Sequence, residues 1–319
     1  MRPEISVVVP CYNEAENINA TNKKIHENLL KITNNFEIIY VDDGSFDNTF
    51  ASLFALSTDD NRIKIVKLSR NFGHQKAIYA GLEKTSGKCI ILIDADLQDP
   101  PEMFTKMYEN WKAGYKVVYG VRKKREGSFL KLLAYSIYHK VFNLLSNIKH
   151  KNDLADFCLI DEVIKNHLLN FKEKNIYFRG LRSWLGFKQI GLEYDRKDRK
   201  VGLSKYSVFK LYNLALNGIL NFSTKPLTFI LFSGVFIFLI SFGLVIFYLM
   251  QKIFNFEFLG ILPDQVPGFY TIIIFILLFG SFNLICLGLI GEYIGRLYEE
   301  SKSRPKYIID ETVNIDEKN

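Results

Sequence analysis

The chain has 319 residues, with 41 Lys or Arg against 34 Asp or Glu and a formal net charge of +7, a length that suits one α/β domain plus a smaller part. Its basic residues are not interleaved with aromatic ones in a recognition motif, which excludes nucleic acid as the expected partner and favours a membrane surface. Four isolated cysteines, at positions 11, 89, 158 and 286, argue against a zinc site or disulfide framework and for a reducing compartment.

Strands and helices are expected to alternate through the first 120 residues. Ile5 to Pro10 is a β-branched run, and apolar residues then recur at the helical period up to Ile32. Because the chain runs directly into this strand, we expect no cleavable signal peptide. Asp47 and Thr49 are predicted to cap a second helix. Further strands are predicted at Phe36–Val41, Ile63–Leu68, Cys89–Asp94 and Lys116–Tyr119, and a helix at Gln75–Thr85.

This order predicts a doubly wound, mostly parallel sheet with a Rossmann-like α/β fold. Right-handed crossovers would place the strand ends along one edge. These ends are Pro10, Asp42, Ser69, Asp94 and Gly120. Ligands bind at that edge in open α/β sheets, but Gly-x-Gly-x-x-Gly occurs nowhere, so a dinucleotide enzyme is rejected.

One carboxylate pair directly follows a predicted strand. Asp94, Asp96 and Gln98 come after Cys-Ile-Ile-Leu-Ile, and Pro100-Pro101 prevents the strand from continuing. Alternating hard oxygen ligands suit Mg²⁺ or Mn²⁺ that already carries a diphosphate. Because an isolated Asp-x-Asp also occurs on solvated turns, the metal hypothesis depends on the surrounding motifs.

Two later segments, near residues 130–147 and 207–222, carry apolar residues on one helical face. Either segment alone fits a core-facing helix of a soluble domain. Their place just ahead of a long apolar run favours amphipathic helices at a membrane interface.

Most of the apolar surplus lies after Pro226, in two uncharged runs at 227–250 and 269–290. Each run is long enough to cross a roughly 30 Å hydrocarbon layer as a helix, which disfavours a buried hairpin of a soluble protein. Cations gather on the outer flanks, and the connecting loop has only Lys252. The flanking cations are Lys205, Lys210, Lys225, Arg296, Lys302, Arg304 and Lys306. The positive-inside rule then places both ends in the cytoplasm.

The expected organisation has three parts. Residues 1–225 form a cytoplasmic catalytic domain, 226–295 form two transmembrane helices, and 296–319 form a cytoplasmic tail. The apolar spans allow self-association into a homo-oligomer.

Four motifs, in this order, resemble the family 2 glycosyltransferases of GT-A fold. They are Val9-Pro10-Cys11-Tyr12-Asn13-Glu14, Asp42-Asp43-Gly44-Ser45, Asp94 to Glu102, and Gly202-Leu203-Ser204-Lys205-Tyr206. Within that family the chain resembles the polyprenyl-phosphate glycosyltransferases, such as dolichol-phosphate mannose synthase and the two-span bacterial bactoprenol glucosyltransferases. Gly291 to Arg296 and Arg304 to Tyr307 are similar to the tail of the bacterial group, so the resemblance covers nearly the whole chain.

The resemblance implies a role for each matching residue. The nucleoside would be held by Pro10, Tyr12, Glu14 and Asp43, with Asp42 beside them. The metal and diphosphate would be held by Asp94, Asp96 and Gln98, with Arg199 and Lys205 neutralising phosphate charge. The lipid phosphate would be received by Arg122, Lys131 and Ser136. Asp96, Asp156 and Arg122 would take part in transfer.

Three departures from the family pattern affect the sugar and acceptor details. Asp156-Phe157-Cys158 stands where the family often has Asp-Phe-Arg, and Leu203 replaces an acidic or polar residue. Lys131 stands where mannose synthases have Arg, so a bidentate fork is lost. Two other positions look unremarkable: His74 and His139 are interpreted as surface or packing histidines.

The implied reaction is inverting transfer of a sugar to polyprenyl phosphate at the cytoplasmic membrane face. UDP-glucose is the first donor choice, ahead of UDP-galactose, UDP-N-acetylglucosamine, a modified arabinose and GDP-mannose. The acceptor phosphate is mostly dianionic at neutral pH, so a strong general base is not obligatory. Asp156 would then orient a cation or sugar hydroxyls, although a helix-capping or surface carboxylate is an equal alternative. Arg122 could equally be a solvated charge in its Arg-Lys-Lys-Arg run.

Two other classes are weighed against this reaction. A processive polysaccharide synthase would carry Gln-x-x-Arg-Trp and more spans, and the chain has neither. A catalytically silent membrane scaffold would keep the fold, but the intact Asp94, Asp96 and Gln98 argue against it.

Overall fold

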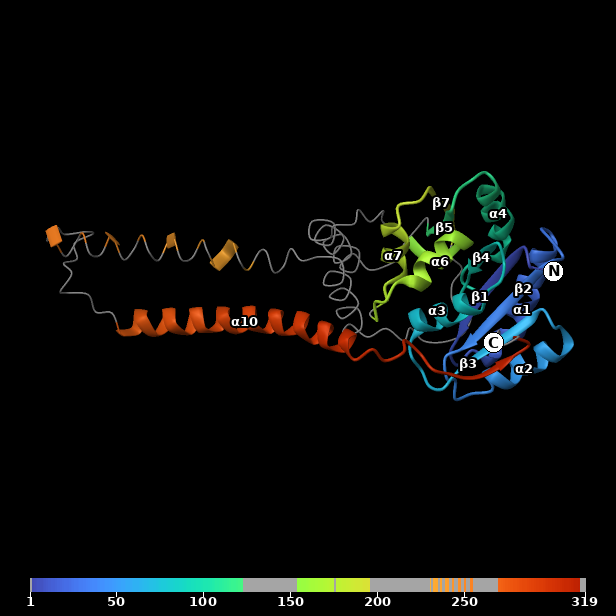
Figure 1. The fold of residues 1–319 in the computed structure, drawn as a ribbon, viewed down its shortest axis with the longest axis horizontal. Helices are drawn as coiled ribbons and strands as arrows, with labels where there is room; N and C mark the ends of the chain where they lie inside the picture. Colours follow the sequence, from blue (N-terminus) through green and yellow to red (C-terminus); the bar gives the residue numbers. More distant parts are fainter. Residues whose placement is uncertain are drawn as a thin grey trace. The chain divides into compact units, whose positions relative to one another are not determined.

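The computed structural model describes residues 2–122, 154–174, 176–195 and 269–315, with scattered residues between 230 and 254. The chain forms two compact units (Figure 1). The first unit comprises 1–144, 148–218 and 304–319, and the second comprises 145–147 and 219–303. The predicted interfacial segments near 130–147 and 207–222 lie outside the described residues.

Among the described residues, the first unit contains an eight-stranded sheet in the order β7-β5-β6-β4-β1-β2-β3-β8. Its strands are β1 (Ile5–Cys11), β2 (Phe36–Asp42), β3 (Ile63–Leu68), β4 (Cys89–Leu92), β5 (Val117–Arg122), β6 (Leu154–Asp161), β7 (Gln189–Tyr194) and β8 (Ile309–Val313). Pairing is parallel for β1 with β2 and β4, for β2 with β3, and for β5 with β7. It is antiparallel for β6 with β4 and β5, and for β8 with β3. The prediction of a mostly parallel α/β sheet is confirmed.

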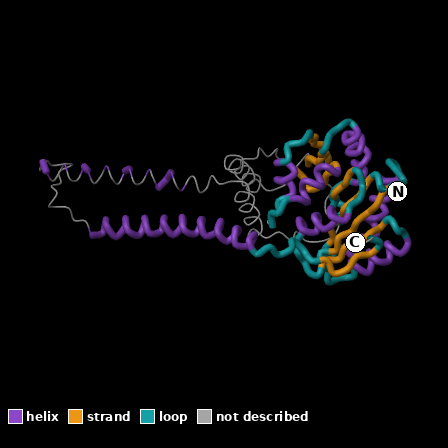
Figure 2. The backbone as a smooth tube through the Cα atoms, viewed as in Figure 1, coloured by secondary structure: helices purple, strands orange, loops and turns teal. Residues whose placement is uncertain are grey.

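Helices pack on both faces of this sheet (Figure 2). They are α1 (Ala15–Leu30), α2 (Thr49–Asp59), α3 (His74–Lys84), α4 (Phe104–Lys112), α6 (Glu162–Asn170) and α7 (Phe178–Trp184), with a short 3₁₀ turn η1 (Pro101–Met103). Val7 and Val9 join the core cluster that includes residues of α1, α2 and α4. Val8 points to the other face, because side chains alternate along a strand. There α3 lies so close that a Cβ on Gly81 would stand 2.3 Å from Val8 Cγ1.

The directions of the strands bring their carboxyl ends to one edge of the sheet. β1 to β4 are mutually parallel, and β5 is parallel to β4 because both run antiparallel to β6. The carboxyl ends of these five strands therefore share an edge, as predicted. The beginning of β6, with Asp156, lies at the same edge because that strand runs the opposite way.

Two local predictions need correction. The fourth strand ends at Leu92 and not at Asp94, so Asp94 lies in the following loop. Asn48, and not Asp47, is the N-cap of α2, and no side chain caps it. The Asp47 carboxylate instead accepts hydrogen bonds from the backbone nitrogens of Thr49 and Ala15, which joins the starts of α2 and α1.

The second unit contains α10 (Phe269–Ser301), which includes the second predicted span. Within the described part of the chain, no helix meets both the length and the apolar character required to cross a membrane. Most of the first predicted span lies outside the described residues. Both spans stay predictions.

Candidate active site

The loops after β1 and β2 are bound to each other by short hydrogen bonds. Asn13 donates its backbone N–H to Ser45 Oγ at 3.0 Å, and its Oδ1 accepts from the backbone nitrogen of Phe46 at 2.9 Å. The Tyr12 ring meets Phe46 edge to face, with centroids 6.4 Å apart. Glu14 Oε2 accepts from Asn17 Nδ2 at 2.7 Å. The predicted nucleoside residues Pro10, Tyr12, Glu14, Asp42 and Asp43 therefore gather at the ends of two neighbouring strands.

Asp42 and Asp43 have different environments in spite of their adjacency. Asp43 accepts from the backbone nitrogens of Phe72 at 2.7 Å and Gly73 at 2.9 Å, which fixes the loop before α3. Burial raises the pKa of Asp43, although these two hydrogen bonds oppose the rise. Asp42 is fully buried, and its Oδ2 has no hydrogen-bond partner among the described residues. An unpartnered buried acceptor is costly, so this carboxylate is a local source of instability.

The loop after β4 presents the second group of carboxylates. Thr21 Oγ1 donates to the Ala95 carbonyl at 2.8 Å, and Tyr194 donates its hydroxyl to Asp99 Oδ1 at 2.5 Å. These contacts attach the loop to α1 and β7. Asp96 Oδ1 accepts from the backbone nitrogen of Gln98 at 3.2 Å. Asp94, Asp96 and Gln98 thus lie together on a loop that tertiary contacts hold in place.

Asp94 lies in a strongly negative environment. Burial, together with the charges of Asp99, Asp156 and Asp96, raises its pKa to about 6, although His74 opposes the rise. No group of three His, Cys, Asp or Glu side chains that could hold a metal occurs in the described part of the chain. Mg²⁺ usually binds through one or two carboxylates together with substrate phosphates and water. Asp94 and Asp96 therefore fit a divalent ion that arrives with a diphosphate.

The Asp156 carboxylate lies at the start of β6 and is bound by Arg179 of α7. Arg179 Nε donates to Oδ1 at 2.9 Å, and its Nη2 donates to Oδ2 at 2.6 Å. The Asp156 side chain is only 12% exposed. The alternatives of a helix cap or a free surface carboxylate are therefore wrong.

His74 is a surface histidine, as predicted, with 39% of its side chain exposed. Its Nε2 also lies 3.5 Å from Asp94 Oδ1 and 3.9 Å from Asp156 Oδ2, between the two carboxylates. The sequence did not predict this position, which the start of α3 gives it. Next to it, Gln75 Oε1 accepts from the backbone nitrogen of Phe178 at 3.0 Å, which attaches α7 to α3.

The electrostatics of Asp156 limit its chemistry. Burial alone would raise the pKa of this carboxyl, but the charge and hydrogen bonds of Arg179 lower it well below its usual range, with His74 and Arg182 adding to the effect. A carboxylate with so low a pKa, both of whose oxygens accept from one guanidinium, is a poor general base at neutral pH. Asp156 is therefore suited to positioning Arg179.

The side chains of several predicted site residues are not described. Arg122 is the last residue of β5, and its backbone pairs in register with Tyr194 at the same sheet edge. Lys131, Ser136, Arg199 and Lys205 lie outside the described residues, as does His139. Conversely, Arg179 had no signal in the sequence beyond its three-residue spacing from Arg182.

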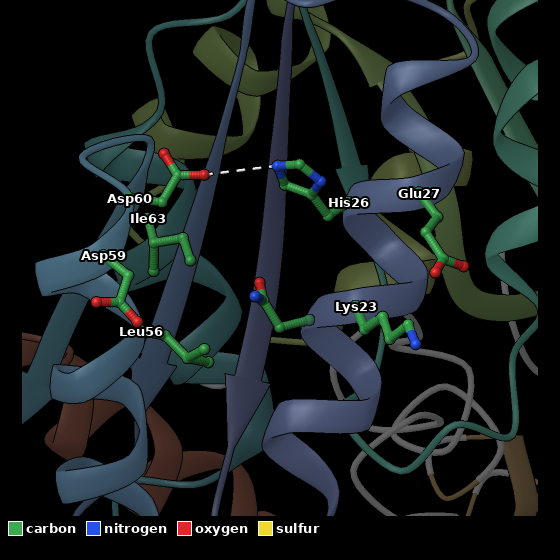
Figure 3. A pocket seen from close by; sticks show the side chains of 8 residues that line it. Lys23, His26, Glu27, Leu56, Asp59, Asp60 and Ile63 are labelled. Carbon is green, nitrogen blue, oxygen red and sulfur yellow. Dashed lines mark ion pairs between the residues drawn. The ribbon is translucent and has the colours of Figure 1, made fainter.

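A hollow of about 370 Å³ lies elsewhere, between α1 and α2 (Figure 3). It is lined by Asn22, Lys23, His26, Glu27, Leu56, Asp59, Asp60 and Ile63. His26 Nε2 lies 3.5 Å from Asp60 Oδ2 across it. Ile63 begins β3, so this hollow lies at the opposite edge of the sheet and is not part of the candidate site.

Comparisons with known proteins give one family model and several relatives. The family model described as Glycosyl transferase family 2 matches residues 6–170. An uncharacterized glycosyltransferase, YkcC of Bacillus subtilis, is 40% identical over 316 residues, which cover 99% of this chain and 96% of the relative. The bactoprenol glucosyl transferase of Shigella phage SfX is 36% identical over 307 residues, with coverage of 96% and 98%. A solved mannosyltransferase from Pyrobaculum calidifontis, in complex with GDP-Man and Mn²⁺, has a TM-score of 0.43 and 19% identity over 60% of this chain and 55% of its own.

Proposed function

Because this chain belongs to glycosyl transferase family 2 and is a glycosyltransferase, we propose that it transfers a sugar from a nucleotide diphosphate sugar to a polyprenyl phosphate, with inversion. The observation that carries the proposal is the arrangement at one sheet edge. Asp94 and Asp96 form an acidic pair there, and His74 bridges Asp94 to the ion pair of Asp156 with Arg179. A site of this kind has one part for a cation-bound diphosphate and another for a second anionic group.

The donor would bind across the ends of β1, β2 and β4. The loops fixed by Asp43 suit the nucleoside, with Pro10, Tyr12 and Glu14 around them and Asp42 buried beside them. Asp94, Asp96 and Gln98 would hold Mg²⁺ or Mn²⁺ with the diphosphate, and the ion would supply charge neutralisation of the leaving group. Arg199 and Lys205 are proposed to add to that neutralisation. UDP-glucose is the proposed donor, supported by relatives that are named as glucosyl transferases.

In the proposed step, an oxygen of the acceptor phosphate attacks the anomeric carbon. The bond from that carbon to the donor diphosphate breaks, and the nucleotide leaves with the bonding electron pair. The acceptor's second pKa of about 6 leaves it mostly dianionic at neutral pH, so no proton needs to be removed. This agrees with an Asp156 that is bound to Arg179 and so ill suited to act as a base. An α-linked donor would give a β-linked lipid-phosphate sugar.

Because the lipid tail of the proposed acceptor lies in a membrane, we propose that the protein is located there too. Residues 1–225 and the tail 296–319 would lie on the cytoplasmic side of the cell membrane, with two spans over 226–295 between them. Apolar side chains of α10 are exposed, among them Ile272, Phe275, Ile276, Leu284 and Leu287, which supports burial of this helix in lipid or against other copies. Lys131 and Ser136, with Arg122, are proposed to meet the lipid phosphate.

The test is a transfer assay with purified protein in detergent, Mg²⁺ or Mn²⁺, a short polyprenyl phosphate and a panel of nucleotide sugars. We expect a glycolipid of the mass of the hexosyl phosphate lipid with UDP-glucose, and none after EDTA treatment. Product with another donor alone would change the sugar and leave the reaction class intact. Failure with every donor would overturn the proposed function.

A further inference from the structure

The short helix α7 carries two arginines to the site, three residues apart on one side of the helix. Arg179 forms the ion pair with Asp156 already described. Arg182 is fully buried, with its Nη2 3.3 Å from the Ala155 carbonyl and its guanidinium carbon 5.2 Å from the centre of the Tyr119 ring. Both guanidinium groups therefore lie against the first residues of β6.

The charge of Arg182 is not balanced locally. Its Nε and Nη1 have no hydrogen-bond partner among the described residues. The carboxylate whose pKa it helps to lower is Asp156, and both oxygens of that group already accept from Arg179. Burial raises the pKa of the neighbouring Cys158 thiol, which therefore stays neutral. Two guanidinium groups thus lie against one carboxylate, Asp156, while the charge of Asp94 also acts on Arg179.

A buried guanidinium with unpaired nitrogens is costly unless its charge serves a binding partner. Arg182 cannot reach such a partner because it is fully enclosed. Arg179 can, since 34% of its side chain is exposed while it stays fixed by Asp156. Its guanidinium has five N–H groups, and the described contacts with Asp156 use two of them. The remaining donors have the geometry that phosphate oxygens accept well.

We propose that Arg179 binds the phosphate of the polyprenyl phosphate acceptor, with Arg182 as a positioning residue that supplies charge behind it. This inference rests on the proposed function. The donor diphosphate is assigned to the acidic pair Asp94 and Asp96 through a divalent ion, so it needs no buried arginine. The acceptor phosphate has no such ion of its own and must reach the anomeric carbon beside that diphosphate. His74 connects the two parts of the site, 3.5 Å from Asp94 and 3.9 Å from Asp156.

The test measures steady-state transfer while the acceptor and the donor are varied separately. Arg179→Gln is expected to raise KM for a short polyprenyl phosphate at least tenfold, and Arg179→Lys to raise it less because the charge remains. KM for the nucleotide sugar, and binding of UDP with Mn²⁺ by calorimetry, should stay within twofold. Inorganic phosphate should compete with the acceptor in the unmodified protein and lose most of this effect in Arg179→Gln.

The matched control is Arg62→Gln, because Arg62 also binds one carboxylate, Asp60, through Nε and Nη2 but at the opposite sheet edge. Both KM values should be unchanged there. If Arg179→Gln fails to fold because Asp156 is left unpaired, the double change Arg179→Gln with Asp156→Asn removes both charges and carries the same expectation.

The outcomes separate the two proposals. An unchanged acceptor KM in a folded Arg179 variant would overturn the inference, and so would a rise confined to the donor KM, which would assign Arg179 to the diphosphate. Absence of any transfer to polyprenyl phosphate by the unmodified protein would instead overturn the proposed function.

Discussion

At the scale of single residues, Asp94 carries a charge that the fold alone does not favour. Burial raises its pKa to about 6, and Asp99, Asp156 and Asp96 contribute, whereas an unfolded aspartate has a pKa of about 3.9. The folded state therefore binds the proton more tightly than the unfolded state. The metal-free protein therefore becomes less stable as the pH rises from about 4 to about 6. Above that range its stability stays at the lower level.

Asp94→Asn should consequently stabilise the protein without metal while abolishing transfer. We expect a gain of about 1 to 2 kcal/mol at pH 7.5, less than the roughly 3 kcal/mol of the full shift because 31% of the side chain is exposed. Thermal unfolding in detergent, with EDTA present, measures it. The gain should shrink toward pH 4, and an equal gain at both pH values would contradict the electrostatic explanation.

Asp47→Asn is a control that should change the stability of the protein in the opposite direction. Although burial would raise it, the pKa of Asp47 is lowered by hydrogen bonds from Thr49 and Ala15. Its charge therefore stabilises the fold at neutral pH, and that contribution disappears as the pH falls through the lowered pKa. The substitution should lower Tm at pH 7.5 and have less effect in acid.

Gly44 is a residue whose missing side chain matters. Its φ is +67°, and a Cβ there would lie 2.5 Å from the backbone carbon of Arg70, just ahead of the loop that Asp43 fixes. Gly44→Ala should cost about 2 kcal/mol or more and weaken UDP binding. Gly114 also has a positive φ, +95°, but open space around its Cβ position. Gly114→Ala should cost about 1 kcal/mol and leave UDP binding unchanged, so equal effects in thermal unfolding and calorimetry would contradict this account.

At the scale of elements, the sequence predicted the parallel strands better than the antiparallel ones. Apolar β-branched runs such as Ile5 to Pro10 are local signals, and polar residues after them mark the sheet edge. β6 and β8 pair with strands that lie far away in the sequence, and nothing in their own pattern names the partner.

The difference between local and long-range signals also explains which site residues the sequence predicted. Asp94 and Asp96 belong to a local motif at a strand end. His74 and Arg179 reach Asp156 because α3 and α7 both begin near the start of β6, where one hydrogen bond joins them, a tertiary effect that no local spacing reveals.

The C-terminal strand β8 covers the edge of β3, as the strand beside β3 in Figure 1 illustrates. Ser69 donates its backbone N–H to the Ile308 carbonyl at 3.0 Å. Asn314 Nδ2 lies 2.9 Å from the Ser57 carbonyl and 3.0 Å from the Ile63 carbonyl. β8 is then the edge strand on this side, and its five residues include the charged Asp310 and Glu311, which make it a poor template for pairing with another chain.

Asn314→Gly tests the attachment of the tail. Glycine accepts the φ of +57° at this position, so the change isolates the lost amide hydrogen bonds. The free energy of unfolding should fall by about 1 to 2 kcal/mol, which thermal unfolding measures as a lower Tm. Asp310→Asn removes a half-exposed ion pair with Lys67 and should cost under about 0.5 kcal/mol. The reverse order of the two losses would show that β8 is held mainly by charge.

At the scale of the whole molecule, the site combines the ends of β1, β2 and β4 with the start of β6 and the helices α3 and α7. An acidic pair at the end of β4 and an arginine-rich helix α7 face each other across His74. In the proposed reaction, this division of charge would separate two anionic substrates that would otherwise repel each other. It is also the reason why a divalent ion and a diphosphate are expected to bind together.

We expect the binding of Mn²⁺ and the binding of UDP to depend on each other. Mn²⁺ alone meets two protein carboxylates, and UDP alone meets a negative environment, so each should raise Tm only slightly. Together they should raise it by several degrees, in proportion to the logarithm of their concentration. Additive shifts in a thermal unfolding titration would contradict a metal held jointly by Asp94, Asp96 and the diphosphate.

The central claim is that the acceptor is a lipid phosphate whose own charge drives attack on the sugar. The most direct measurement compares polyprenyl phosphate with the polyprenol of the same chain length, using UDP-glucose, Mn²⁺ and mass spectrometry of the extracted lipid. The account predicts a glucosyl phosphate lipid from the phosphate and no glycolipid from the alcohol. Glucosylation of the alcohol at a comparable rate would contradict it.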